Sequence, residues 1–371
     1  MKKIDPVITN SVRMLNDDDT ISCVVYTYNY NLALKNLTNM VGANHVFEYP
    51  FINAVGMQTK LGNIYSIANL DCVKYVSSAL KVSALVDKSN EFLGTNNLVV
   101  PNSNNISIAV IDTGCSPHID LMIPKRVIKF VDIVNDKKYM YDDNGHGTFV
   151  AGVIAGSGAY SGGKYQGIDK DANLVIVKAL DNSGQAGALS ILNAMQWIYN
   201  NSTEYNIKVV CMSFGSIPVG VDDPLIRGAE ALWDRGIVVV AAAGNSGPNT
   251  QTIKAPGASS KIITVGALDV DKFTIAQFSS RGPSYYSYKP DLVAPGVNVV
   301  GLNHDLFDYP YVKMSGTSVA TPMIAGICSN IIKLNPALTP NRVKSIILNR
   351  CTPITNDKNI EGFGYYDKNK S

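Results

Sequence analysis

Short apolar runs alternate with helical patterns along most of the chain after residue 105. Five near-continuous apolar runs are typical of strands that are buried on both faces, and they lie at 106–111, 173–179, 207–212, 237–242 and 262–265. Helical periodicity follows at 188–200, 224–235, 318–334 and 340–349, the last with Thr339 as cap and Pro340 in its first turn. Strands that alternate with helices predict an α/β fold with a mostly parallel sheet flanked by helices.

The chain before residue 90 has a different pattern. It predicts strands at 23–28, 45–55 (bounded by Pro50 and Gly56) and 73–84, with helices at 31–40 and 64–70. We interpret this order as a small ferredoxin-like α+β unit. Residues 1–20 are polar and aperiodic, and in 91–105 Pro101 is followed by four Asn or Ser residues. We therefore expect a mobile tail at 1–20, a small domain at 21–90, a linker at 91–105 and a large domain at 106–371.

The amino-acid composition limits the classes of protein to which the chain can belong. The 371 residues are 46% hydrophobic, which suits a large domain and a smaller one. The 32 basic and 30 acidic residues form no long block of one sign, so we expect no nucleic-acid partner. We find no secretory signal and no apolar run of the ~18 residues that span a membrane, so we expect a cytoplasmic protein without a membrane partner. The six cysteines lack paired spacing, which favours buried free thiols over disulfides or a metal site.

Ser318 is the first candidate for chemistry. It follows Gly316-Thr317 and opens the apolar pattern 318–334. A serine hydroxyl is a poor nucleophile at neutral pH, so it needs a base for its proton and donors for the resulting oxyanion. The helix start supplies one donor, the backbone N–H of Ser318. Since serine is also a preferred N-cap, the triplet alone leaves a capping role open.

A base and an orienting acid can be chosen from the same sequence. Of the histidines, His146 stands out because flanking glycines let backbone and substrate approach its ring; we interpret His45, His118 and His304 as structural. Asp112 ends the strand 106–111, at the edge where α/β folds place their sites. Asn245 follows the run 237–242 and brings an amide that could stabilise an oxyanion.

Seven short segments in this order resemble the subtilisin family of serine proteases, over about 106–364. They are Ile111-Asp112-Thr113-Gly114, Gly145-His146-Gly147-Thr148, Ser213-Phe214-Gly215, Ala243-Gly244-Asn245, Phe278-Ser279-Ser280-Arg281-Gly282, Ala294-Pro295-Gly296 and Gly316-Thr317-Ser318. The resemblance implies a serine endopeptidase that works through an acyl-enzyme. By it, Asp112 is the orienting acid, His146 the general base and Ser318 the nucleophile. Asn245 and the Ser318 N–H would form the oxyanion hole.

The resemblance also implies how a polypeptide substrate binds. An extended substrate would pair with an edge strand on each side and form a β-sheet with them. These edges are Ser213-Phe214-Gly215 and the loop 183–187 with Gly184; the wall of the pocket before the scissile bond is Ala242-Ala243-Gly244. By a rough alignment Lys254 lies at the base of that pocket, where relatives often have a small residue. A lysine there favours a polar or acidic partner, so the sequence leaves the preference of the pocket open.

The small domain resembles the prodomain of this family, which acts as chaperone and inhibitor. We expect a self-inhibited proenzyme that cleaves itself after Leu85, with Leu85 in the primary pocket; the alternative is a permanent accessory domain. The pattern at 156–165 is similar to cytoplasmic bacterial subtilases and departs from secreted subtilisins where their calcium loop lies. We expect no required cofactor and no catalytic metal, and leave structural calcium open.

Two other functions compete with this hypothesis. Asp112-Thr113-Gly114 is also a signature of aspartic proteases, but their chemistry needs a second such carboxylate and the sequence has no second Asp-Thr-Gly or Asp-Ser-Gly. The other alternative is a catalytically silent or permanently autoinhibited regulator on a protease fold. Because Asp112, His146, Asn245 and Ser318 are all present, an intact enzyme is the simpler hypothesis.

Overall fold

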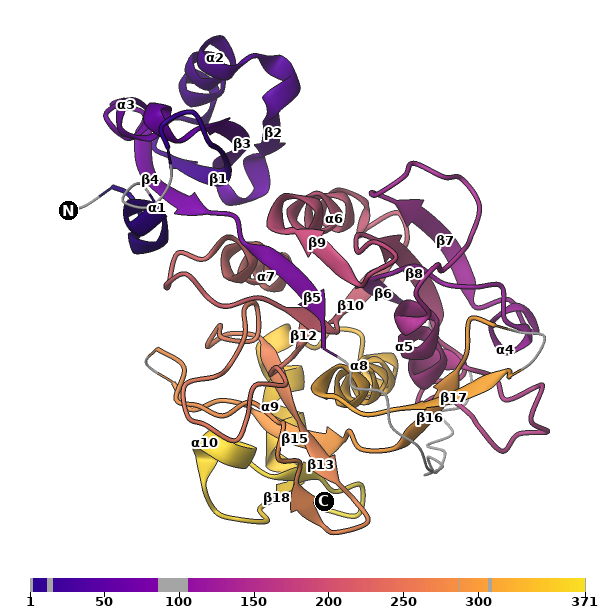
Figure 1. Ribbon diagram of the computed structural model, residues 1–371. Coiled ribbons are helices and arrows are strands. Elements are labelled where there is room, and N and C mark those ends of the chain that lie inside the picture. The colour runs from indigo at the N-terminus through magenta and orange to yellow at the C-terminus, as the bar shows by residue number, and fades with distance from the viewer. Residues whose placement is uncertain (1–2, 12–15, 86–105, 286, 306–308, 371) are drawn as a thin grey trace.

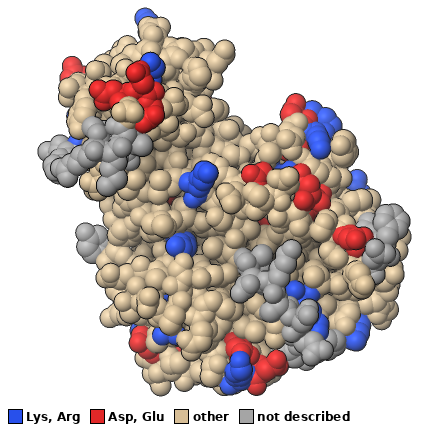
Figure 2. Space-filling view, in the orientation of Figure 1, with Lys and Arg blue, Asp and Glu red and all other residues tan. Residues whose placement is uncertain are grey.

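The computed structural model describes residues 3–11, 16–85, 106–285, 287–305 and 309–370. A small N-terminal unit stands on a larger body, and strand β5 (Lys81–Ala84) runs from the first into the second (Figure 1). The space-filling view shows the same outline, with basic and acidic side chains scattered over this face (Figure 2). The linker expected at 91–105 lies outside the described residues.

A ten-stranded, mostly parallel sheet forms the centre of the larger body. Its main order is β18 (Cys351–Thr352), β19 (Tyr365–Tyr366), β15 (Leu292–Pro295), β13 (Ile263–Asp269), β12 (Val238–Ala242), β10 (Ile207–Met212), β6 (Ser107–Asp112), β8 (Asn173–Lys178) and β7 (Val127–Asp132), while β14 (Thr274–Ile275) pairs with β13. From β6 the chain builds β7 and β8 on one side, and then β10 and β12 on the other. The order of strands therefore reverses between β6 and β10, where α/β sheets commonly bind ligands.

Helices flank this sheet, which confirms the predicted fold class. Helices α5 (His146–Ala155) and α8 (Thr317–Leu334) pack on each other, and α6 (Ala188–Asn201) packs on α7 (Pro224–Asp234); α9 (Pro340–Asn349) contacts α8. Helix α8 is apolar and long enough to cross a membrane, but 89% of it is buried in the molecule. It is thus the central helix of the core, and Ser318 lies in its first turn.

The small unit has its own sheet and its own core. Its elements are β1 (Thr20–Thr27), α2 (Tyr30–Val41), β2 (Val46–Tyr49), β3 (Ala54–Lys60), α3 (Ile64–Ala68) and β4 (Val73–Ser78), with sheet order β2-β3-β1-β4. This is the β-α-β-β-α-β arrangement of ferredoxin-like units. The expected strand at 45–55 is two strands, because Pro50 opens a 3-10 turn, Pro50–Ile52, between them.

The N-terminal residues differ from the expected mobile tail. Residues Pro6–Ser11 form helix α1, and Ile4 pairs with Val76 at the edge of β4. Asp5 is fully buried and accepts a hydrogen bond from the Ile8 N–H at 2.8 Å, while Ile8 packs in the core of the small unit. An aspartate followed by proline is a helix-start signal, which the polar composition of the segment concealed.

The remaining elements also belong to the larger body. They are β9 (Gln185–Gly187), β11 (Phe214–Gly215), the hairpin of β16 (Val299–Leu302) and β17 (Tyr311–Met314), and the short helices α4 (Ile119–Met122) and α10 (Lys358–Glu361). All six cysteines of the sequence are described, and each is a buried free thiol as expected. Within the described ranges, no group of three or more His, Cys, Asp or Glu is placed to hold a metal ion.

Candidate active site

Asp112 and His146 form a buried pair at the point where the strand order reverses. Asp112 ends β6 and His146 begins α5, and each side chain is 1% exposed. His146 Nδ1 lies 2.6 Å from Asp112 Oδ1. Helix α5 can approach this closely because Gly147 has no side chain: an added Cβ would lie 2.1 Å from the Gly114 carbonyl oxygen. The two residues predicted from the sequence are thus brought together.

The pair raises the pKa of His146 above its ordinary value of 6.5. Burial alone lowers that pKa, but the negative charge of Asp112 and its hydrogen bond outweigh burial, with a further contribution from Asp142. In the part of the chain that the structure describes, His146 Nε2 is buried without a hydrogen-bond partner. A buried imidazole nitrogen that is free to accept is what a general base requires.

Asp142 holds the loop before α5, and the sequence analysis missed it. Its Oδ1 accepts from Thr113 Oγ1 at 2.9 Å and from the Gly145 N–H at 2.9 Å. Its Oδ2 accepts from the Thr148 N–H at 2.8 Å and the Thr148 hydroxyl at 2.7 Å. Burial raises the pKa of Asp142, but these hydrogen bonds prevail and lower it. A carboxylate just before a helix start was the available signal.

Ser318 is not a capping residue. The N-cap position of α8 is Gly316, and the Ser318 hydroxyl donates instead to the Leu85 carbonyl oxygen at 2.5 Å. Among the described residues, no hydrogen bond joins Ser318 Oγ to His146 Nε2. The Ser318 side chain is buried, and its own carbonyl accepts from Ser213 Oγ at 2.9 Å. The Ser318 hydroxyl therefore donates to a backbone carbonyl of a distant segment of the same chain.

Asn245 contacts the same carbonyl oxygen. Its Nδ2 donates to Leu85 O at 2.8 Å, while its Oδ1 accepts from the Thr317 N–H at 3.0 Å and the Thr317 hydroxyl at 2.9 Å. Thr317 thereby fixes which end of the amide faces Leu85, a role that the sequence analysis missed. For the other expected oxyanion donor, the Ser318 N–H, the described residues include no hydrogen-bond partner, so that role stays a prediction.

Strand β5 lies between the two edges that were expected to bind substrate. It pairs with β11 through Ala84 opposite Phe214, and with β9 through Val82 opposite Ala186, both antiparallel. Figure 1 shows β5 beside β9. Further backbone bonds run from the Ala84 N–H to the Gly184 carbonyl at 2.8 Å and from the Leu85 N–H to the Ser213 carbonyl at 3.4 Å. The expected strand at 73–84 is thus divided, because the chain leaves the small sheet after Ser78 and enters this one.

The expected pocket wall, Ala242-Ala243-Gly244, is buried. Ala242 and Ala243 are fully buried, and the Gly244 N–H donates to Thr317 Oγ1 at 3.1 Å. Leu85 is half-buried, and its Cδ1 would lie 3.2 Å from a Cβ added to Gly215. Gly215, one of the residues expected to contact substrate, therefore lies beside the Leu85 side chain of the same molecule.

The other histidines lie outside this arrangement of hydrogen bonds. His118 caps α4, with Nδ1 accepting from the Asp120 N–H, and its Nε2 lies 3.0 Å from the Pro310 carbonyl oxygen. His45 ends a 3-10 turn of the small unit. His304 lies against Gly145, since its Nδ1 would be 2.3 Å from a Cβ added there.

Comparisons with known proteins agree on one family. Residues 103–365 match the Subtilase family. The chain is 42% identical to the serine protease AprX of Bacillus subtilis (strain 168) over 314 residues, which are 76% of this chain and 71% of that protein. It is 33% identical to Subtilisin DY of Bacillus licheniformis over 270 residues, which are 71% of this chain and 88% of that one.

Two solved structures superpose on this chain and share its fold. Sphericase superposes with a TM-score of 0.65 at 28% identity, over 75% of this chain and 95% of that chain. The S41 psychrophilic protease superposes with a TM-score of 0.63 at 31% identity, over 71% of this chain and 91% of that one.

Proposed function

Because the chain belongs to the subtilase family and is a subtilisin-type serine endopeptidase, we propose that Ser318, His146 and Asp112 act as its nucleophile, general base and orienting acid. The observation that carries this proposal is the position of Leu85. Its carbonyl oxygen lies 2.5 Å from Ser318 Oγ and 2.8 Å from Asn245 Nδ2, as the carbonyl of a bound substrate or product would.

In the first half of the reaction, Ser318 Oγ attacks the carbonyl carbon and His146 Nε2 takes the hydroxyl proton. Asp112 holds the Nδ1–H of the ring and stabilises the imidazolium, in line with their 2.6 Å separation. Charge builds on the carbonyl oxygen, where the Asn245 amide stabilises it. The imidazolium then protonates the leaving amine, and an acyl ester with Ser318 remains.

In the second half, a water molecule takes the place of the leaving amine. His146 accepts a proton from that water as it attacks the ester, and then returns a proton to Ser318 Oγ. Side chains supply every proton transfer and the charge stabilisation in this scheme, so we propose that the reaction requires no cofactor. Polypeptides are the substrates of the reaction, as befits an endopeptidase that binds extended chain by strand pairing.

We further propose that the small unit is an inhibitory prodomain, with Leu85 as the residue before the bond that the enzyme cleaves in its own chain. The support is that β5 fills both substrate edges while Leu85 reaches the nucleophile. A chain bound this way blocks the cleft against other substrates. The alternative of a permanent accessory domain differs in predicting an uncut chain.

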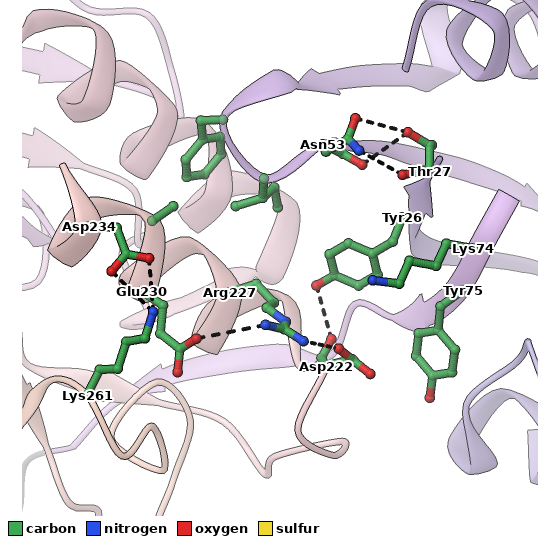
Figure 3. Close-up of a pocket in the computed structure, with 13 residues that line it drawn as sticks. Tyr26, Thr27, Asn53, Lys74, Tyr75, Asp222, Arg227, Glu230, Asp234 and Lys261 are labelled. Carbon is green, nitrogen blue, oxygen red and sulfur yellow. Dashed lines mark hydrogen bonds and ion pairs between the residues drawn. The ribbon is translucent and has the colours of Figure 1, made fainter. Parts of the chain in front are cut away.

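Val24, Tyr49 and Ala54 of the small unit pack into the core of the body, but the seam beside them is incompletely filled and is lined mainly by polar and charged side chains. A cavity of about 280 Å³ lies there, between Tyr26 and its neighbours on one side and α7 on the other (Figure 3). Tyr26 points across it and donates to the Asp222 carbonyl at 3.0 Å. The charges on the body side are already paired, Arg227 with Asp222 and Lys261 with Asp234.

The six free thiols also support the expected location. Burial raises the pKa of Cys23 and Cys211 to about 12, so these thiols are unreactive as well as unpaired. Free thiols of this kind are typical of a reducing compartment, and we propose that the enzyme acts in the cytoplasm.

Labelling with a fluorophosphonate probe tests the proposed nucleophile. An active serine attacks the probe and keeps it, so the expected result is one label per chain, found on Ser318. Ser183, an exposed serine that bonds to Asp181 beside the same cleft, is the internal control and should stay unlabelled. A labelled peptide without Ser318, or no labelling of a chain that hydrolyses peptides, would contradict the assignment.

A further inference from the structure

A lysine side chain lines the pocket that receives Leu85. Lys254 passes between two glycines of the substrate cleft: a Cβ added to Gly215 would lie 2.7 Å from Lys254 Cβ, and one added to Gly244 would lie 2.5 Å from Lys254 Cγ. The same added atom on Gly215 would lie 3.2 Å from Leu85 Cδ1. The first carbons of Lys254 and the tip of Leu85 thus share one wall, and the ammonium is three bonds beyond Cγ.

The ammonium of Lys254 is partly withdrawn from water. Lys254 is half-buried, and burial, the one cause at this site, lowers its pKa. Over the ranges that the structure describes, its Nζ makes no hydrogen bond or ion pair. The three buried lysines among the described residues differ, because each is paired with an aspartate: Lys178 with Asp143 at 2.7 Å, Lys289 with Asp291 at 2.5 Å and Lys333 with Asp169 at 2.6 Å. A desolvated cation without an anion loses hydration that a ligand carboxylate can replace.

We propose that Lys254 determines the specificity of the primary pocket and selects a glutamate before the cleaved bond. This inference rests on the proposed function, since it takes Leu85 as the residue in that position. A glutamate reaches one bond farther than the Leu85 methyl groups, so its carboxylate can meet the ammonium while its methylenes keep the contact with Gly215. Leucine is accepted because the methylenes of Lys254 offer it an apolar surface. The segment of this chain that ends at Leu85 therefore binds in the pocket, although leucine is not the residue that the pocket prefers.

The first test measures binding without hydrolysis, in the full chain with Ser318→Ala. Leu85→Glu and Leu85→Gln differ in charge but not in shape, and each is combined with Lys254 or with Lys254→Met, which keeps the length of the side chain. We expect the glutamate chain to melt roughly 2 °C above the glutamine chain with Lys254, and at the same temperature with Lys254→Met. Lys272→Met, which removes an exposed lysine paired with Asp269, is the control and should leave the difference intact.

The second test uses the active enzyme and peptides that end in Val-Ser-Ala-Xaa before the cleaved bond. With Lys254, kcat/KM should be about tenfold higher for glutamate than for glutamine, the effect of one charge-assisted hydrogen bond. In Lys254→Met that ratio should fall to about one. Added salt should lower the ratio in wild type alone.

The outcomes separate the two proposals. A glutamate-to-glutamine ratio near one in wild type, or a ratio that survives in Lys254→Met, would overturn the role of Lys254 while leaving the protease function intact. If wild type cleaved none of the peptides, the proposed protease function would be in question. The melting temperatures would still test the role of Lys254, because equal values for all four chains would refute its preference for glutamate.

Discussion

The catalytic pair and the small unit are held in place by different kinds of contact. Asp112 and His146 lie on buried elements of one core, and Asp142 ties their loops together through hydrogen bonds to backbone and hydroxyl groups. The small unit has a core of its own. One face of its sheet also packs into the core of the body through Val24, Tyr49 and Ala54, and β5, two tyrosine hydroxyls and a seam with a cavity complete the contact. Catalytic geometry should therefore tolerate little change, whereas release of the small unit requires that β5 and this apolar face separate from the body.

The largest effect should come from the nucleophile. Ser318→Ala removes one hydroxyl, and we expect peptide hydrolysis to fall by about a millionfold, the effect known for the prototype of this family rather than one derived from this chain. The melting temperature should stay near that of wild type, because the change costs about one hydrogen bond, roughly 1 kcal/mol. Assays of kcat and thermal melting check both statements; a variant that keeps substantial activity would rule out Ser318.

A smaller loss is expected at Thr317, which orients the Asn245 amide. Thr317→Val keeps the shape of this fully buried residue and removes its hydroxyl, so the bonds to Asn245 Oδ1 and from the Gly244 N–H are lost. We expect kcat to fall roughly tenfold with little change in KM, because the amide acts mainly on the transition state. Thr317→Ser retains the hydroxyl and is the matched control. Equal rates for the two variants would mean that Thr317 does not position Asn245.

The pH profile sharpens the account of the buried pair. Since Asp112 raises the pKa of His146, and the base must be neutral to accept a proton, kcat/KM should rise with pH through a midpoint above 6.5. Asp112→Asn removes the negative charge that raises the pKa of His146, while the ring stays buried. The midpoint should therefore move to lower pH, and the rate should fall. Asp136→Asn, an exposed carboxylate paired with Lys138, should shift nothing. A midpoint near pH 4 would favour a carboxylate dyad instead.

The contacts of the small unit should give the smallest effect. Tyr49 is fully buried and donates to the Leu189 carbonyl of the body at 3.0 Å. Tyr49→Phe removes that bond, about 1 kcal/mol, so the freshly purified chain should react with a fluorophosphonate roughly fivefold faster. Tyr30→Phe removes a bond to Glu48 within the small unit and is the matched control. Equal rates in both variants would show that the seam does not limit access to Ser318.

The sequence was most informative where a pattern has a single physical cause. The strand predicted at 207–212 matches β10, and the helix predicted at 340–349 matches α9, because apolar runs and cap residues are local signals. The candidate nucleophile Ser318, base His146 and acid Asp112 could be chosen from the sequence because each lies at the start of a helix or the end of a strand. Asp142 carried a local signal, a carboxylate just before a helix start, that was overlooked, whereas Thr317 escaped notice since its role depends on a contact with the distant residue Asn245, which no local pattern encodes.

The division of 73–84 into β4 and β5 could not be predicted for the same reason. The sequence of each half is typical of a strand. The chain leaves the small sheet between Ser78 and Lys81 because β9 and β11 offer edges with which the second half can pair. Residues 3–11 illustrate the reverse case, in which a polar segment is ordered by one buried carboxylate, Asp5, and one apolar side chain, Ile8.

The central claim is that Ser318 cleaves this chain after Leu85 and that the small unit then leaves. Intact mass and N-terminal sequencing of purified wild type and Ser318→Ala test it most directly. The account predicts that wild type loses about 85 residues, close to the size expected of a small domain, with a new N-terminus just after Leu85, and that Ser318→Ala stays at full length. A wild-type chain that remains uncut while fully active on peptides would contradict it, as would the same cleavage in Ser318→Ala.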